Sequence, residues 1–224
     1  MSKFYIPTNG VAGWQSLLAD PVKHWKTGYS AKALACCWEE AQGFPVEVIN
    51  LFEGTALEGI KFLLGIPEHK VPLRGGSTQS QNDAFILAKA GNELVSITVE
   101  GKVAEPFGPT LGEWLQDASA GKSVRLDYLK KRLCLRGDVS PDIRYQLLHR
   151  TASAVIEAKR FNASKAVMIV HSFSQETLWF DDYSAFLALY GKSASVGDLV
   201  CVCTIDGIDL FLGWAKGDAK YLEA

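Results

Sequence analysis

Residues 80–103 read SQNDAFILAKAGNELVSITVEGKV, with two apolar runs on either side of Gly91-Asn92. A two-residue connection that begins with glycine is typical of a type II′ turn, so the segment predicts a β-hairpin. Pairing that is symmetric about this turn places Asp83 directly opposite Glu100, with their Cβ atoms roughly 4.5–5.5 Å apart. Lys102 lies on the same strand face as Glu100, about 6.5 Å further along. The hairpin therefore gathers two carboxylates and one ammonium group at its open end.

Carboxylates that face each other in a sheet repel, so this pair needs a neutralising partner. Lys102 alone, protonation of one carboxyl group, or a divalent cation between the oxygens would each meet that need. Magnesium prefers hard oxygen ligands and is often held by one or two carboxylates, with water and a substrate phosphate completing its shell. A lysine beside such an ion can orient or deprotonate an attacking water. The pattern suits Mg²⁺ or Mn²⁺ as a cofactor and leaves the other two solutions open.

Helix and strand signals are mixed along the rest of the chain. Ser30 is expected to cap a helix over 31–41, Pro45 to begin one over 45–52, and Ser140-Pro141 to begin a long helix over 142–161. Pro67 interrupts the apolar run 61–73, which suits an edge strand or a bulge. Further helices are expected over 110–118, 123–135 and 181–191, a buried strand over 166–173, and a second hairpin over 199–215. The fold class is therefore α/β or α+β, with a mixed central sheet flanked by helices.

An acidic residue that opens one strand, D/E-x-K that ends the next, and then a helix and a buried strand resemble the PD-(D/E)XK nuclease superfamily. Within it the chain looks most like small bacterial proteins of undetermined role. The resemblance covers roughly residues 61–172 and implies a restriction-endonuclease-like αβββαβ core that cleaves phosphodiester bonds with a metal. We expect a single domain over 1–224, with a helical arm over 1–45, the nuclease-like core over about 46–172, and a helix and an extra C-terminal hairpin over 173–224.

By this resemblance Asp83 corresponds to the first acid, and Glu100 and Lys102 correspond to the E-x-K. Asp83 and Glu100 would hold the metal, with the backbone carbonyl of Gly101 as a further ligand. Lys102 would position the attacking water. Many members also carry a catalytic glutamine in the helix before the last core strand, and Gln146 matches it here.

His149 and Arg150 follow Gln146 by about one helical turn and, with Arg144, are expected to bind the substrate. The match to the superfamily is partial. Arg150 stands where a tyrosine often follows the glutamine, and Asn82 stands where a proline often precedes the first acid.

D/E-x-K occurs four times in the chain, at Glu68, Glu100, Glu157 and Asp218. Of these, the instance at Glu100 alone combines a preceding apolar strand with an acid across a hairpin. The one at Glu157 lies within an expected helix, where positions i and i+2 diverge. Glu68 is the second choice and is otherwise expected to add a supporting carboxylate from the neighbouring strand.

The formal net charge of −2 argues against a protein that coats nucleic acid by bulk electrostatics. Residues 122–160, however, contain ten Lys or Arg and four Asp or Glu, a local excess of six positive charges. A face that tracks phosphates would produce this asymmetry, and so would an ordinary solvated helix pair. The expected partner is nucleic acid, with DNA favoured over RNA. RGGST at 74–78 resembles an anion-binding turn but lacks P-loop spacing, so no phosphate site is expected there.

Two other interpretations remain open. In the first, the protein keeps the nuclease fold but binds or regulates nucleic acid without chemistry. In the second, Asp83, Glu100 and Lys102 form structural salt bridges, and the true site lies elsewhere, for example beside His149 and His171.

The five cysteines have neither zinc-finger nor disulfide-framework spacing and are expected to be reduced and mostly buried. The sequence shows neither a signal peptide nor 18 uninterrupted apolar residues. We therefore expect a cytoplasmic protein without a membrane span.

Overall fold

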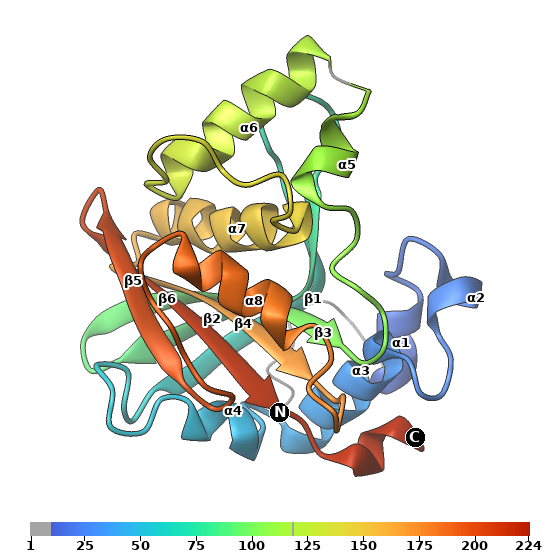
Figure 1. Cartoon of the computed structure of the whole chain (residues 1–224). Coiled ribbons are helices and arrows are strands. Elements are labelled where there is room, and N and C mark those ends of the chain that lie inside the picture. The colour runs from blue at the N-terminus through green and yellow to red at the C-terminus, as the bar shows by residue number, and fades with distance from the viewer. Residues whose placement is uncertain (1–9, 118) are drawn as a thin grey trace.

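The computed structural model describes residues 10–117 and 119–224. Six strands form one mixed sheet in the order β1-β2-β3-β4-β6-β5, and helices cover both of its faces (Figure 1). The strands are β1 (Lys61–Val71), β2 (Ser80–Ala90), β3 (Glu93–Lys102), β4 (Lys165–Ser172), β5 (Leu199–Ile205) and β6 (Ile208–Lys216). β4 pairs parallel with both β3 and β6, and the other neighbours pair antiparallel. The expected mixed sheet and C-terminal hairpin are confirmed.

Two helical layers bury the apolar faces of this sheet. α3 (Ser30–Ala41) and α4 (Val46–Asn50) pack on one face, and α7 (Tyr145–Phe161) and α8 (Phe180–Ala188) pack on the other. The remaining elements are α1 (Val11–Gln15), α2 (Pro21–His24), α5 (Leu111–Leu115), α6 (Ala120–Arg132) and a 3₁₀ helix at Ala219–Leu222. Every residue of β4 is buried, as its nearly continuous apolar sequence predicts. The first nine residues of the expected arm and Ala118 of an expected helix lie outside the described residues.

No helix among the described residues is both long and apolar enough to cross a membrane.

The first hairpin pairs in the predicted register. Ala84 pairs with Val99, so Asp83 lies across from Glu100. Gly91 has a φ of +56°, whereas Asn92 does not take a positive φ, which is what a type II′ turn requires.

β1 is an edge strand, as expected from Pro67, because an edge leaves one side of the ladder unpaired. The irregularity in its register lies between Phe62 and Leu64 and not at the proline. Glu68 has a φ of +51°, a left-handed conformation that costs a non-glycine residue about 1–2 kcal/mol. The strand therefore carries a local strain beside the open end of the hairpin.

Two helices begin earlier than the sequence predicts. Tyr29 is the N-cap of α3, so Ser30 is its first helical residue and not its cap. α6 begins at Ala120, capped by the side chain of Ser119, and so includes a turn that was not expected to be helical.

The long helix α7 begins at Tyr145 and not at residue 142. The reason is tertiary: the backbone between Pro141 and Tyr145 bonds to the segment that enters α5. The N–H of Gly112 donates to the carbonyl of Pro141 at 2.8 Å, and the N–H of Tyr145 donates to the carbonyl of Pro109 at 3.1 Å. Ser140-Pro141 therefore opens a turn, and Arg144 is the extended residue before the helix.

Residues 74–78, the RGGST loop, receive a side chain from α6. The guanidinium of Arg125 donates to the carbonyls of Arg74 at 3.0 Å and Gly76 at 3.2 Å. The carbonyl groups of the loop therefore accept hydrogen bonds from a cationic side chain of the protein itself. Gly75 permits this close approach, because a Cβ there would lie 2.4 Å from the carbonyl oxygen of Gly121.

Gly75→Ala is expected to lower the free energy of unfolding by roughly 2–5 kcal/mol, since the methyl group would meet both left-handed strain and the backbone of α6. Gly137→Ala is the control: its φ is +74°, but no atom lies within 4 Å of the added Cβ. The control should lose only about 1–2 kcal/mol in urea unfolding. Equal losses in the two variants would mean that the contact between α6 and the loop adds no stability.

Candidate functional site

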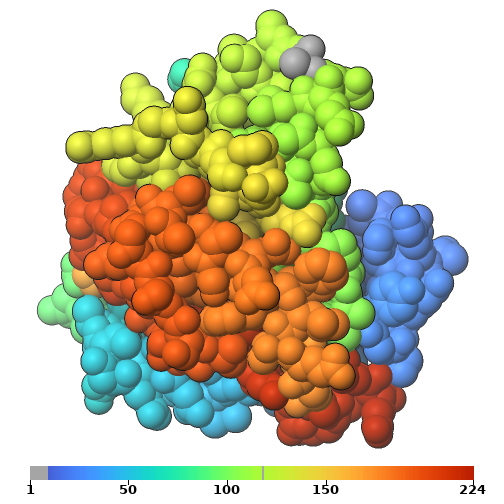
Figure 2. Space-filling view, viewed as in Figure 1, coloured from blue at the N-terminus to red at the C-terminus, as the bar shows by residue number. Residues whose placement is uncertain are grey.

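A pocket of about 680 Å³ lies at the end of the sheet where β1, β2 and β3 carry acidic residues. The sheet and α7 contribute Glu68, Asp83, Glu100, Lys102, Gln146 and Arg150 to its lining. The opposite wall comes from the arm that leads into α3, over residues 18–31. In Figure 2 this arm, drawn in blue, stands beside the green segment that follows β3.

Two hydroxyl groups of β3 fix α7 over the sheet. Ser96 donates to the carbonyl of Ala154 at 2.9 Å, and Thr98 donates to the carbonyl of Arg150 at 3.1 Å. Both hydroxyls are buried, so these bonds set the position of the helix closely. The first turns of α7 are thereby held above Glu100.

Glu100 is 3% exposed and accepts from three donors. Lys102 Nζ lies 2.6 Å and Gln146 Nε2 lies 2.7 Å from Oε1, while Arg150 Nε lies 2.5 Å from Oε2. Burial opposes ionisation, but the charges of Arg150 and Lys102 overcome it and hold the pKa of Glu100 below its ordinary value. Glu100 is therefore an ionised carboxylate that is neutralised from within the protein.

Asp83 lacks such support. Its Oδ2 accepts from the backbone N–H of Gly101 at 2.7 Å, and its Oδ1 has no hydrogen-bond partner within the described part of the chain. Burial, followed by the charges of Glu100 and Glu68, raises the pKa of Asp83 well above its ordinary value. Asp83 is thus costly to ionise without an additional cation.

Glu68 is the third carboxylate of the pocket. It falls between the pairs Pro67–Ala84 and His69–Asn82, so it lies opposite Asp83 on the neighbouring strand. Its Oε2 accepts from Gln81 Nε2 at 2.7 Å. Burial raises the pKa of Glu68 to about 7, and the nearby charge of Glu100 adds to the rise. The like-charged pair that most needs a partner is therefore Asp83 with Glu68.

The charges of the pocket's inner end do not balance. Among the described residues, three carboxylates meet there, and the buried cations that face them are Lys102 and Arg150. With all of these groups ionised, one negative charge remains in a poorly solvated place. A divalent cation together with the single negative charge of a phosphodiester would bring the set to neutrality.

The structure brings Gln146 and Arg150 to the predicted carboxylates, whereas His149 lines the adjoining hollow of about 260 Å³ and Arg144 lines neither space. Arg144 bonds to Asp182 at 2.9 Å and to the carbonyl of Gly108, and it does not line the 680 Å³ pocket. His149 Nδ1 lies 2.8 Å from the hydroxyl of Ser80, and that hydroxyl accepts from Arg150 at 3.2 Å. Burial and the charge of Arg150 hold the pKa of His149 well below its ordinary value, so the ring is neutral.

Most basic residues of 122–160 are occupied by contacts within the protein. Six of the ten have carbonyl or carboxylate partners: Lys122 with Trp114, Arg125 with the 74–78 loop, Arg144 with Asp182, Arg150 with Glu100, Lys159 with Asp206, and Arg160 with Glu157. The local charge excess therefore reflects internal pairing more than an open basic face.

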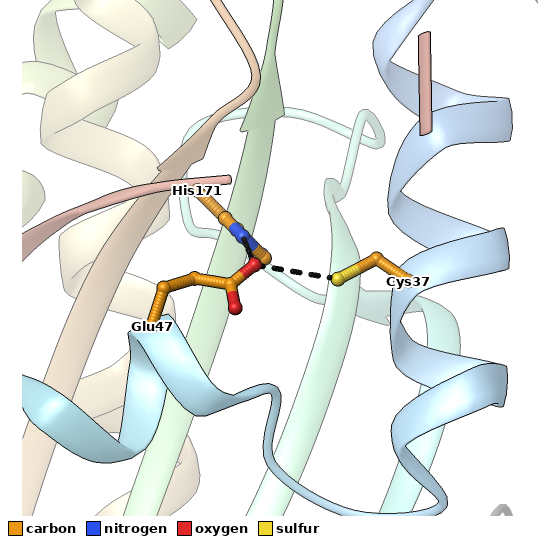
Figure 3. A group of neighbouring side chains, drawn as sticks. All are labelled: Cys37, Glu47 and His171. Carbon is orange, nitrogen blue, oxygen red and sulfur yellow. Dashed lines mark hydrogen bonds and ion pairs between the residues drawn. The ribbon is translucent and has the colours of Figure 1, made fainter. Parts of the chain in front are cut away.

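A second cluster lies on the other side of the sheet, where Cys37, Glu47 and His171 have ligand atoms within 4.8 Å of one another (Figure 3). No other such group of three occurs in the described residues. Trp38 Nε1 donates to His171 Nδ1 at 3.1 Å, so the ring proton of neutral His171 is on Nε2, which lies 2.9 Å from Glu47 Oε1.

That arrangement does not suit a metal, because a ligating histidine must offer a lone pair on one nitrogen and normally donates from the other. Burial raises the pKa of the Cys37 thiol far above its ordinary value, which also makes it a poor ligand and a poor nucleophile. The cluster is a hydrogen-bonded link between α3, α4 and β4. The alternative site beside His171 has no support from this geometry.

Sequence patterns did not identify the arm wall of the pocket. Lys23, His24 and Lys26 lie in a segment with little periodicity, and nothing in their spacing indicates that they face Asp83. The sequence predicts Glu68 as a supporting carboxylate, but its place opposite Asp83 depends on the pairing of β1 with β2. The sequence signal for this position was a single acidic residue, Glu68, directly after Pro67 in an expected strand.

In metal-free buffer, the free energy of unfolding should fall as the pH rises from about 4.5 to about 7. The reason is that a carboxyl group whose pKa is raised on folding favours the folded state only while it is protonated. Glu68→Gln should remove up to about 3 kcal/mol of this loss, at about 1.4 kcal/mol for each pKa unit. The exposed Glu53→Gln is the control. Urea unfolding at several pH values with a chelator checks this, and parallel curves for wild type and Glu68→Gln would contradict it.

Comparison with known proteins adds one match. No curated protein and no solved structure matches the chain. A family model described as a domain of unknown function, DUF6946, matches residues 7–219. These residues include every strand of the sheet and all the acidic residues of the pocket, and the chain therefore belongs to the DUF6946 family.

Proposed function

We propose that this pocket is the active site of a Mg²⁺- or Mn²⁺-dependent phosphodiesterase that hydrolyses nucleic acid. The observation that carries the proposal is that three carboxyl groups on adjacent strands, Glu68, Asp83 and Glu100, lie beside two buried cations, so Asp83 and Glu68 are costly to ionise without a further cation. A protein fold rarely retains an uncompensated buried carboxylate without a use for it. The resemblance to PD-(D/E)XK nucleases supports the same chemistry.

The oxygen donors present suit magnesium better than softer metals. Asp83 Oδ1 and Glu68 are the available carboxylate oxygens, since Glu100 already accepts from three donors. The carbonyl of Gly101 faces the same side of β3 as its N–H, which reaches Asp83. The three carboxylates do not form a group within 4.8 Å, so two of them with water would hold the ion, a common arrangement for magnesium.

A bound divalent ion would stabilise the charge that develops on a phosphodiester oxygen and would make a bound water more acidic. In the reaction, a water oxygen adds to phosphorus, the P–O bond to the departing nucleoside breaks, and that oxygen takes up a proton. The protein's own residues would orient these groups.

Gln146 is placed to hold the attacking water. Its Nε2 donates to Glu100, which fixes the amide, and its Oε1 is a buried acceptor with no protein partner within the described residues. Such an atom usually has a water or ligand partner. Lys102 and Arg150 would face the negative charge of the scissile phosphate from the same end of the pocket.

A second candidate is a nuclease-like protein that binds nucleic acid without cleaving it. The completeness of the Glu100 network favours this candidate, because Lys102 and Arg150 already have a carboxylate partner. A catalytic lysine would have to leave Glu100, at least in part, to reach the water.

Isothermal titration with Mn²⁺ tests the proposal. The wild type should bind one ion, and Asp83→Asn and Glu68→Gln should each weaken binding at least tenfold, while Asp83→Asn also abolishes cleavage of a linear oligonucleotide. Glu47→Gln, in the other cluster, is the control and should bind Mn²⁺ as the wild type does. Circular dichroism establishes that each variant is folded.

Saturable Mn²⁺ binding without cleavage would favour the second candidate. Mn²⁺ binding that survives Asp83→Asn but is lost in Glu47→Gln would overturn the assignment of the metal centre.

A further inference from the structure

The two walls of the pocket carry opposite charge. The sheet wall is formed by Glu68, Asp83 and Glu100, and the facing wall carries Lys23, His24 and Lys26 from α2 and the loop after it. These three basic side chains are exposed and form no ion pair within the described residues. They are therefore available to a ligand that is itself anionic.

The pocket is also limited in size. Its volume of about 680 Å³ lies within the range of roughly 300–1,000 Å³ that is typical of small-molecule sites. The sheet and the arm over residues 18–31 both line this pocket, so a group that reaches Asp83 lies between these two walls. A single nucleotide at the end of a strand is small enough for such a space.

A second, smaller hollow of about 260 Å³ adjoins the first and shares Gln81, Gly108, Gln146 and Arg150 with it. Tyr145 lines this second hollow and is stacked on Trp114, with ring centroids 4.0 Å apart. The Tyr145 ring is buried against Trp114 and His149, so the hollow does not present an open aromatic face to a base. The scissile phosphate would then lie at the junction, beside Gln146 and Arg150.

We propose that the pocket binds the free end of a single-stranded nucleic acid, with the terminal nucleotide between the carboxylates and the basic wall of Lys23, His24 and Lys26. This inference rests on the proposed function and adds its substrate class. The lysines bind a terminal phosphate that is distinct from the scissile one, and the strand continues past the smaller hollow. Hydrolysis at the junction releases one nucleotide at a time.

The test uses the full-length protein with Mn²⁺ and three forms of one sequence: a linear single strand, the same strand closed into a circle, and a blunt duplex. The linear strand should be cleaved at least tenfold faster than either other form, and the products should be mononucleotides. A free dinucleotide serves as a fourth substrate, and cleavage of it faster than the linear strand would assign the site to small nucleotides and overturn the inference.

The double variant Lys23→Glu/Lys26→Glu should raise KM for the linear strand at least tenfold and leave kcat within about threefold. The control Lys61→Glu/Lys192→Glu makes the same charge change at two exposed lysines outside the pocket and should leave KM unchanged. Equal effects of the two double variants would overturn the role of the basic wall.

The outcomes separate this inference from the proposed function. Cleavage of the circle at the rate of the linear strand overturns the preference for strand ends but leaves the phosphodiesterase standing. No cleavage of any substrate overturns the phosphodiesterase and the inference together.

Discussion

The ion pair between Arg150 of α7 and Glu100 of β3 determines how the rest of the pocket is built. Both groups are buried, and removal of either partner from such a pair commonly costs about 3–5 kcal/mol because the other charge is left unpaired. The pair fixes the beginning of α7 above the end of β3, so Gln146 is fixed as well. It also removes Glu100 from the set of carboxylates that are free to accept a cation.

Because Glu100 is already paired with Arg150, it behaves differently from Asp83 and Glu68, although all three acids share one pocket. Asp83 and Glu68 lie opposite each other on adjacent strands, and their pKa values are raised because burial and the charge of Glu100 both oppose ionisation. The strain at Glu68, whose φ is +51°, is located at this same place. Residues in sparsely populated backbone conformations cluster at active sites and ligand clamps.

Much of this could be predicted from the sequence, because its determinants are local. Gly91-Asn92 and the alternating runs around it specify the register that opposes Asp83 to Glu100. The start of α7 could not be predicted in this way, since the backbone of residues 141–145 bonds to the segment before α5 and overrides the Ser140-Pro141 signal. The same holds for Arg144, which turns to Asp182, and for Lys23, which reaches the pocket only through the packing of the arm.

We propose that one divalent cation binds where Asp83 and Glu68 lie opposite each other. A crystal soaked in Mn²⁺ tests it most directly, because anomalous scattering locates the ion independently of any activity. We expect a peak bonded to an oxygen of Asp83 and close to Glu68, with Glu100 still paired to Arg150. A crystal without density there, or with its manganese bound beside Cys37 and His171, would contradict it.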